Sequence, residues 1–322
     1  MHQLTKMLSY CRPAGSSMER QFIERYITPY EPTVDKANNR IITVGDNPKV
    51  MFSCHTDTVH HLPKRQKIHT DKHGIIHAGS KHSNCLGADD TAGIYVALGL
   101  IDRGIEGTYI FHAGEEIGCI GAKHLAEHEE DFIKSFDISI ALDRRGTQSL
   151  VTAQTCMIGA SDEFAKAFCA AIGMKHSPDP TGLWTDNIEY LNMIPELVNL
   201  SVGYSGAHTV HERLDSTYLF KLVDALAQVD YKDLPIIRDL SQPQGIVDTY
   251  YGSYTGKYDH EDDLEDLIRR FPSQIAHLLE TFGFDGDDIL DFLTKEEGLD
   301  DYQVYKHLTA PGRDDWWDDF DR

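Results

Sequence analysis

The most constraining feature of this 322-residue chain is a set of short apolar segments, each leading abruptly into side chains that can bind a metal ion. Such fully apolar runs are typical of strands that are buried on both faces of a sheet. The three clearest examples are Lys49–Cys54 before His55, Thr108–His112 before Glu115, and Phe136–Leu142 before Asp143.

Helical segments alternate with these strands. Asp90–Arg103 has helical spacing and is closed by Gly104, while Ser161–Ile172 begins at a serine cap and ends before a glycine. Thr217–Val229 is a further helix. This alternation predicts an α/β domain over residues 1–235, with a mixed, largely parallel central sheet.

Charge and cysteine content exclude several classes of protein. The 52 acidic and 30 basic residues give a formal net charge of −22, so we expect no nucleic-acid and no membrane partner. The N-terminus is too polar for a signal peptide, and no apolar run reaches the ~18 residues of a membrane span. The six cysteines are scattered and form no CxxC pattern, which favours reduced thiols and a cytoplasmic location.

The C-terminal quarter has a different composition. Most of the acidic excess lies from Ile236 onward. Residues 236–259 are rich in Gly, Ser, Tyr, Gln and Pro and are predicted to be a linker. Residues 260–322 contain short amphipathic patterns and an acidic, aromatic end, so we predict a small helical extension. It carries no catalytic motif, and it would serve self-association or a protein partner, with a solvated tail as the alternative.

Polar residues at the strand ends should meet, because ligands gather beyond the carboxyl ends of strands in such sheets. His55 and Asp57 are two apart on a strand and therefore share a face, so Asp57 can orient the imidazole. Asp89 and Asp90 stand at a helix start, where Asp90 can cap the helix while Asp89 stays available to metal ions. Each pair also has an ordinary interpretation, as a turn or as a cap.

Two further segments allow the same double interpretation. Glu115 and Glu116 repel each other unless something positive is near, and beside a metal Glu116 can be a ligand and Glu115 a general base. The alternative is an acidic helix start. Asp143 could pair with Arg144 instead, and His208 could be purely structural.

Taken together, these residues favour one site over several unrelated explanations. Two histidines and three carboxylates, one of them shared, are what two zinc-like ions about 3.5–4 Å apart require. Zn²⁺ is the first expectation, and Co²⁺ and Mn²⁺ accept such ligands too. The five expected ligands are His55, Asp89, Glu116, Asp143 and His208.

Five segments resemble those of the co-catalytic zinc exopeptidases, a group that includes bacterial aminopeptidases, carboxypeptidase G-like enzymes and related deacylases. The segments are SCHTDTVH, LGADDTAGI, AGEEIGCIGA, ALD and GAHTVHE, and the resemblance covers roughly residues 4–230. It implies a three-layer αβα fold with Asp89 as the bridging ligand, Glu115 as the general base and Asp57 as the partner of His55. It also favours His208 over His211 as the last ligand.

One departure from these relatives narrows the function. Many of them insert a lid and dimerisation domain before the final histidine, whereas here only 65 positions separate Asp143 from His208. The resemblance therefore implies a compact aminopeptidase that acts on short peptides through metal-activated water. The alternatives are an N-acyl amino acid amidohydrolase that uses the same site and a non-catalytic binding protein that acts through its acidic C-terminal module.

Three residues are candidate substrate contacts. Asp186 lies in GLWTDNIEY, which resembles a pocket loop of the relatives, and it could receive a free α-amino group or simply form a turn. Arg144 could reach the substrate or pair with a carboxylate of the site. Tyr204 is the third candidate.

Overall fold

The computed structural model describes residues 2–79, 83–155, 157–242 and 279. Its centre is an eight-stranded sheet whose four middle strands, β14, β9, β4 and β8, are parallel, while β10, β3 and β2 join antiparallel to their inner neighbours. The predicted mixed, largely parallel sheet is thereby confirmed. In spatial order the strands are β13 (Ser177–Asp179), β10 (Ser149–Val151), β14 (Glu196–Ser201), β9 (Ile138–Arg144), β4 (Val50–His55), β8 (Gly107–His112), β3 (Arg40–Val44) and β2 (Thr33–Val34).

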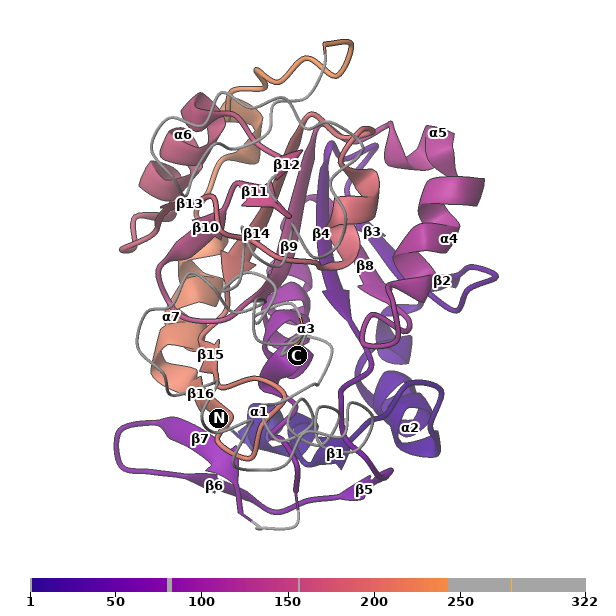
Figure 1. The fold of residues 1–322 in the computed structure, drawn as a ribbon, viewed down its shortest axis with the longest axis vertical. Helices are drawn as coiled ribbons and strands as arrows, with labels where there is room; N and C mark the ends of the chain where they lie inside the picture. Colours follow the sequence, from indigo (N-terminus) through magenta and orange to yellow (C-terminus); the bar gives the residue numbers. More distant parts are fainter. Residues whose placement is uncertain (1, 80–82, 156, 243–278, 280–322) are drawn as a thin grey trace, which may run out of the picture. The chain divides into compact units, whose positions relative to one another are not determined.

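Helices cover both faces of this sheet, as the expected three-layer arrangement requires. Figure 1 shows α6 and α7 on one flank and α4 and α5 on the other. The helices are α1 (His2–Met7), α2 (Ser17–Tyr26), α3 (Ala88–Ile101), α4 (Ile120–His128), α5 (Glu130–Ile133), α6 (Asp162–Ile172) and α7 (Ser216–Leu226), with 3₁₀ turns η1 (Thr28–Tyr30), η2 (Asp186–Tyr190) and η3 (Tyr231–Asp233).

Two apolar cores follow from this layering. Neighbouring strand residues point to opposite faces. On β8, Tyr109 therefore joins the larger core, which contains α3, α6 and α7, while Ile110 joins the smaller core beneath α4 and α5. On β4, Phe52 and Met51 divide between the cores in the same way. Burial on both faces explains why these strands are continuously apolar in the sequence.

Local signals in the sequence place several element ends. Ser16 caps α2 by accepting a hydrogen bond from the Glu19 amide at 3.2 Å, and Ser161 caps α6 through the Phe164 amide. Gly173 ends α6 with φ 64°, a conformation that glycine adopts without strain. The two ends of α6 agree with the helix predicted over Ser161–Ile172.

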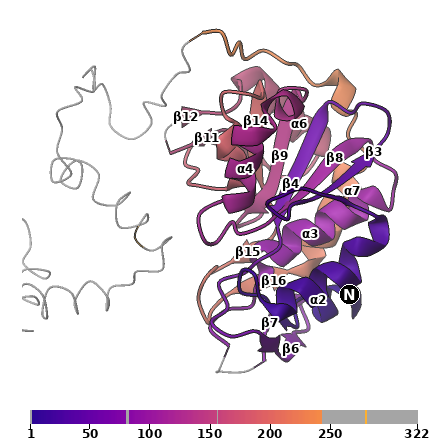
Figure 2. The ribbon, with the colours of Figure 1, turned by 90° about the vertical axis from the view of Figure 1, so that its right-hand side faces the viewer.

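Smaller sheets lie beyond the carboxyl ends of the central strands. Figures 1 and 2 both place β6, β7 and α2 past that end of the sheet. A hairpin that turns at residues 71–74 is formed by β6 (Ile68–Thr70) and β7 (Ile75–Ala78), which pair antiparallel. β7 also pairs with β16 (Arg213–Asp215), and β16 with β15 (Tyr204–Ser205). Two short pairs complete the fold: β1 (Tyr10–Cys11) with β5 (Lys64–Arg65), and β11 (Ala153–Gln154) with β12 (Met157–Ile158).

The body of the domain continues slightly past the expected boundary at residue 235. The amides of Ile237 and Arg238 donate to Glu196 Oε1 at 2.9 and 3.0 Å, and the Arg238 guanidinium donates to the Gly159 carbonyl. The rest of the predicted linker beyond Gln242 and, apart from Leu279, the predicted extension over 260–322 lie outside the described residues. Within the described part of the chain, no helix is long and apolar enough to cross a membrane.

Candidate metal centre

The fold brings the five expected ligand residues together at the carboxyl ends of the central strands. His55 is the last residue of β4, and Asp143 is near the end of β9. Glu116 follows β8, Asp89 lies at the entry to α3, and His208 lies in the loop between β15 and β16. Parallel neighbours end at the same edge of a sheet, which explains why residues this far apart in sequence meet.

Asp89 stands between two groups of side chains with metal-ligand chemistry. Its Oδ1 lies 3.1 Å from His55 Nε2, and its Oδ2 lies 3.3 Å from His208 Nε2. Asp143 completes the group around His55, with Oδ1 at 3.8 Å from Nε2, and Glu116 completes the group around His208, at 3.2 Å. In each group the ligand atoms lie within 4.8 Å of one another. One carboxylate thus serves two neighbouring triads.

Asp57 contacts His55 and also the loop that carries Glu115 and Glu116. It is fully buried, and its Oδ1 lies 3.5 Å from His55 Nδ1, the ring nitrogen that faces away from Asp89. Its two oxygens also accept hydrogen bonds from the amides of Glu115 and Glu116, each at 3.1 Å. A single carboxylate therefore orients one imidazole and fixes the loop that follows β8.

The backbone at Asp89 is held in place by hydrogen bonds to the side chain of Glu212. The buried Glu212 carboxylate accepts hydrogen bonds from four consecutive amides, at distances of 2.7 to 3.0 Å, from Leu86, Gly87, Ala88 and Asp89. Burial together with the charge of Asp89 raises the pKa of Glu212 to about 7. No sequence pattern pointed to Glu212, although it ends the same GAHTVHE segment that contains His208.

Asp90 has the capping role that was expected. Its Oδ1 accepts a hydrogen bond from the Gly93 amide at 2.8 Å, and its Oδ2 accepts one from the His55 amide at 3.2 Å. Asp89 and Asp90 both have non-helical backbone angles, so the regular part of α3 begins after them. Asp89 therefore faces the cluster, while Asp90 caps the start of the helix.

Carboxylates outnumber basic side chains in this cluster, so the site has an excess of negative charge. Burial raises the pKa of Asp143 and of Glu116, and the nearby Asp89 raises both further. Burial acts to lower the pKa of His208, but hydrogen bonds with Asp89 and Glu116 prevail and raise it to about 11. In the same way, contacts with Asp57 and Asp89 raise the pKa of His55 well above its ordinary value. The cluster therefore stabilises positive charge strongly.

Glu115 differs from the expected ligands in its position. Its Oε2 lies 3.9 Å from His55 Nε2, at the edge of the cluster. Burial raises its pKa well above the ordinary range, and the charges of Glu116, Asp143 and Asp186 add to this effect. A carboxyl group at the edge of such a cluster is placed to exchange a proton with a group that the cluster binds.

The three candidate substrate contacts are all engaged with protein groups. Tyr204 donates its hydroxyl hydrogen to Asp143, with 3.1 Å to Oδ1. Arg144 forms an ion pair with Asp179 at 3.0 Å. Asp186 is buried, with Oδ2 at 3.2 Å from His112 Nδ1 and Oδ1 without a hydrogen-bond partner. The structure thus gives Tyr204 a place against an expected ligand and Arg144 a partner outside the cluster.

A buried arginine lies behind the centre, and nothing in the sequence pointed to it. Arg12 is fully buried; its Nε donates to the Thr56 carbonyl and its Nη1 to Thr91 Oγ1, each at 2.8 Å. Its guanidinium carbon also lies 4.0 Å from the centre of the Phe22 ring. Burial lowers the pKa of Arg12 to about 10, while the charges of nearby acids, Asp57 among them, raise it. Arg12 therefore offsets part of the negative charge of the site.

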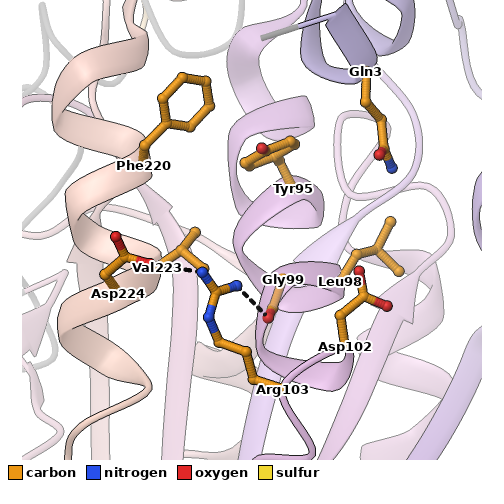
Figure 3. Close-up of a pocket in the computed structure, with 9 residues that line it drawn as sticks. All are labelled: Gln3, Tyr95, Leu98, Gly99, Asp102, Arg103, Phe220, Val223 and Asp224. Carbon is orange, nitrogen blue, oxygen red and sulfur yellow. Dashed lines mark hydrogen bonds and ion pairs between the residues drawn. The ribbon is translucent and has the colours of Figure 1, made fainter.

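A separate surface cavity of about 300 Å³ lies between α3 and α7 (Figure 3). Arg103 crosses it, with hydrogen bonds to Asp224 at 2.6 Å and to the Gly99 carbonyl at 2.8 Å. The cavity shares no residue with the metal-type cluster. Its lining consists of Gln3, Tyr95, Leu98, Gly99, Asp102, Arg103, Phe220, Val223 and Asp224.

The cluster suits divalent metal ions on the chemistry of its donors. Imidazole nitrogens and carboxylate oxygens in triads around a shared carboxylate are the donor set of a two-metal site. Glu116 Oε1 is buried and has no hydrogen-bond partner. A buried oxygen without a partner is unfavourable unless it binds something else, and a bound cation would satisfy it. We therefore treat the cluster as a candidate metal centre.

Solved structures of peptidases share this fold. Aminopeptidase PepT from Bacillus cereus ATCC 10987 superposes with a TM-score of 0.56 at 16% identity, covering 70% of this chain and 96% of the other. A tripeptidase from Staphylococcus aureus subsp. aureus Mu50 gives 0.58 at 16% identity, with 70% and 95% covered. The TET1 peptidase of Pyrococcus horikoshii gives 0.53 at 18% identity, with 70% and 98% covered.

No protein-family model matches the chain, and no curated protein matches its sequence. The structural similarities show that the chain has the fold of solved aminopeptidases. This is the fold that the resemblance to co-catalytic zinc exopeptidases implied.

Proposed function

We propose that the protein is a metal-dependent exopeptidase, and specifically an aminopeptidase that acts on short peptides. The observation that carries this proposal is the position of Asp89 between two triads, 3.1 Å from His55 and 3.3 Å from His208. In this proposal His55 and Asp143 hold one divalent ion, Glu116 and His208 hold the other, and Asp89 is shared. Zn²⁺ is our first choice, with Co²⁺ or Mn²⁺ as alternatives.

Ions bound there would supply Lewis acidity, polarising a carbonyl and lowering the pKa of water. The protein contributes the proton transfer, and we assign it to Glu115. Its Oε2 lies 3.9 Å from His55 Nε2 at the edge of the cluster, where a carboxylate can take a proton from water and later pass it to the leaving amine. Asp57 would keep the His55 imidazole in place during these steps.

Two observations favour an aminopeptidase over a carboxypeptidase or a deacylase. The segment between Asp143 and His208 is used for elements of the core, from β10 to β15, and no domain is inserted there. The similar folds of PepT and a tripeptidase agree with this choice.

Replacing the proposed base tests the mechanism. Glu115→Gln removes the proton acceptor but keeps the size of the side chain, so we expect kcat to fall by about 10²–10⁴-fold. Metal content, measured by mass spectrometry, should stay at the wild-type level, and Glu129→Gln, at an acid outside the cluster, is the control. Near-normal turnover of Glu115→Gln would contradict the assignment.

Parallel assays separate the proposal from its alternatives. Hydrolysis of aminoacyl anilides supports an aminopeptidase, whereas hydrolysis of N-acyl amino acids alone would favour the amidohydrolase. A protein that binds no metal and cleaves neither substrate would fit the third alternative, a binding protein that acts through its C-terminal module.

We also propose self-association and a reducing location such as the cytoplasm. The TET1 peptidase can assemble into a tetrahedron or a large octahedral shell, which supports a homo-oligomer for a chain of the same fold. Light scattering on the full chain tests this. The described cysteines Cys11, Cys54, Cys85, Cys119 and Cys169 are free thiols, which suits a reducing compartment.

A further inference from the structure

Exposed apolar side chains gather on the loops that leave the candidate metal centre. Nine large apolar side chains are exposed among the described residues; apart from Leu62, on the loop after His55, four of them lie on three of these loops. The four are Ile117, Ile120, Trp184 and Val210. A single exposed apolar side chain is ordinary at a protein surface, but four of them on loops that lead away from one cluster form a candidate contact surface for a ligand.

The first loop follows β8 and presents two isoleucines. The amides of Gly118 and Cys119 donate to the Glu115 carbonyl at 2.9 and 3.0 Å, which coils this loop tightly. Ile117 directly follows Glu116 and is 64% exposed, and Ile120 at the start of α4 is 49% exposed. The coil that fixes the acidic pair thus also fixes these two apolar side chains.

The other two loops approach the same cluster through ligand residues. Thr185 donates its hydroxyl hydrogen to Asp143 Oδ2 at 2.8 Å. Trp184, 47% exposed, directly precedes it in the chain, and the indole Nε1 of Trp184 donates to Glu189 Oε1 at 3.4 Å. Val210 is 54% exposed and stands two positions after His208, whose Nε2 lies 3.2 Å from Glu116. The three loops therefore meet at the two triads.

We propose that these four side chains, the apolar rim, bind a large apolar side chain of the peptide substrate beside the scissile bond. This inference rests on the proposed peptidase function and adds the substrate class to it. A leucine or phenylalanine side chain placed on the rim leaves water together with the rim, which favours its binding over that of alanine.

The neighbouring charges define the competing substrate class. Arg145, exposed and two positions after Asp143, would favour an acidic side chain instead. Arg144 is less suited to that role because it is paired with Asp179. We choose the apolar class because four side chains from three loops support it, against one guanidinium.

The experiment compares four substrates on the zinc-loaded protein. We expect kcat/KM for leucyl and phenylalanyl p-nitroanilide to exceed that for alanyl p-nitroanilide by about 10-fold or more, with the glutamyl substrate the poorest. Ile117→Ser, Trp184→Ser and Val210→Ser should each reduce the leucyl-to-alanyl ratio of kcat/KM.

Matched controls exist elsewhere on the surface. Val34 is 50% exposed and Ile237 is 55% exposed, and neither belongs to the rim. Val34→Ser and Ile237→Ser should therefore leave the ratio unchanged. As a second readout, titration calorimetry on the zinc-loaded Glu115→Gln protein should show tighter binding of Leu-Gly-Gly than of Ala-Gly-Gly, with the difference lost on adding Trp184→Ser.

The outcomes distinguish the two levels of the proposal. If no anilide is cleaved, the peptidase function fails and this inference fails with it. Cleavage without apolar preference, or a glutamyl preference that Arg145→Gln abolishes, overturns the inference and leaves the function standing. Rim variants that change the oligomeric state in sedimentation, with unaltered kcat/KM ratios, would overturn it in favour of an interface between copies.

Discussion

At the scale of single residues, burial of a polar side chain can determine whether it carries a charge in the folded protein. His60 illustrates this near the candidate metal centre. It is 3% exposed, its Nδ1 lies 2.7 Å from Thr58 Oγ1, and its ring contacts the space that a side chain at Gly87 would need. Burial lowers the pKa of His60 to about 4, so the folded protein holds this imidazole neutral.

This pKa predicts a pH dependence of stability. An unfolded histidine titrates near pH 6.5, so between about pH 6.5 and 4 the unfolded chain binds a proton that the folded protein excludes. Stability is therefore complete above pH 6.5 and falls as the pH decreases towards 4, by at most about 3 kcal/mol.

Urea unfolding at pH 7 and at pH 5 measures this effect. His60→Gln should be less sensitive to the change of pH than wild type, because it cannot take up the proton. His73→Gln, at an exposed histidine, is the control. An equal loss of stability in wild type and His60→Gln would show that His60 does not contribute.

At the scale of elements, α3 determines where Asp89 stands, and close contact with the sheet determines where α3 stands. A Cβ on Gly93 would lie 2.1 Å from the Leu142 carbonyl oxygen, which belongs to the backbone of β9 and cannot move aside easily. Only glycine allows this approach of helix to strand. This close packing keeps the start of α3, with Asp89, at a defined position relative to Asp143 on β9.

Two alanine substitutions in the same helix test this contact. Gly93→Ala should lower the free energy of unfolding by about 3 kcal/mol and weaken metal binding, because the added methyl group pushes α3 away from β9. Gly99→Ala should change stability by only about 1 kcal/mol, since its Cβ would meet a methyl group of the Val223 side chain at 2.8 Å, and a side chain can shift more easily than the backbone of a central strand. Urea unfolding measures the free energy of unfolding of both variants. Similar losses of stability in the two would show that the contact between Gly93 and β9 is not special.

At the scale of the whole molecule, the fold concentrates negative charge in its interior. Six carboxyl groups lie at the candidate centre, where Arg12 and two imidazoles offset their charge in part. They are Asp57, Asp89, Asp90, Glu115, Glu116 and Asp143. Bound cations would relieve the remaining repulsion in the folded state only, so they should stabilise the fold.

Removing metal should therefore lower the melting temperature. One ion present at 100 times its Kd contributes about 2.7 kcal/mol, which corresponds to a decrease of about 5–10 °C on chelation for a domain of this size. Differential scanning calorimetry with and without EDTA measures it. Asp89→Asn should melt at the same temperature with and without chelator, and an unchanged wild-type melting temperature would contradict a structural effect of metal.

The amino-acid sequence was sufficient to predict the fold class and to select the residues expected as metal ligands. Apolar strands that are buried on both faces, helices with serine caps, and polar residues at strand ends are local patterns, so they can be recognised without coordinates. The roles of His55, Asp89, Glu115 and the other selected residues remain proposals, but their convergence at one edge follows from the parallel order of the strands.

The tertiary structure alone decided which groups support those residues. Glu212 binds four amides of a segment more than 120 positions away, Arg12 enters the centre from the N-terminal segment, and the apolar rim joins three separate loops. No sequence spacing encodes such contacts, because each depends on how distant segments pack. Local chemistry thus indicates which residues are able to act, and packing decides which of them meet.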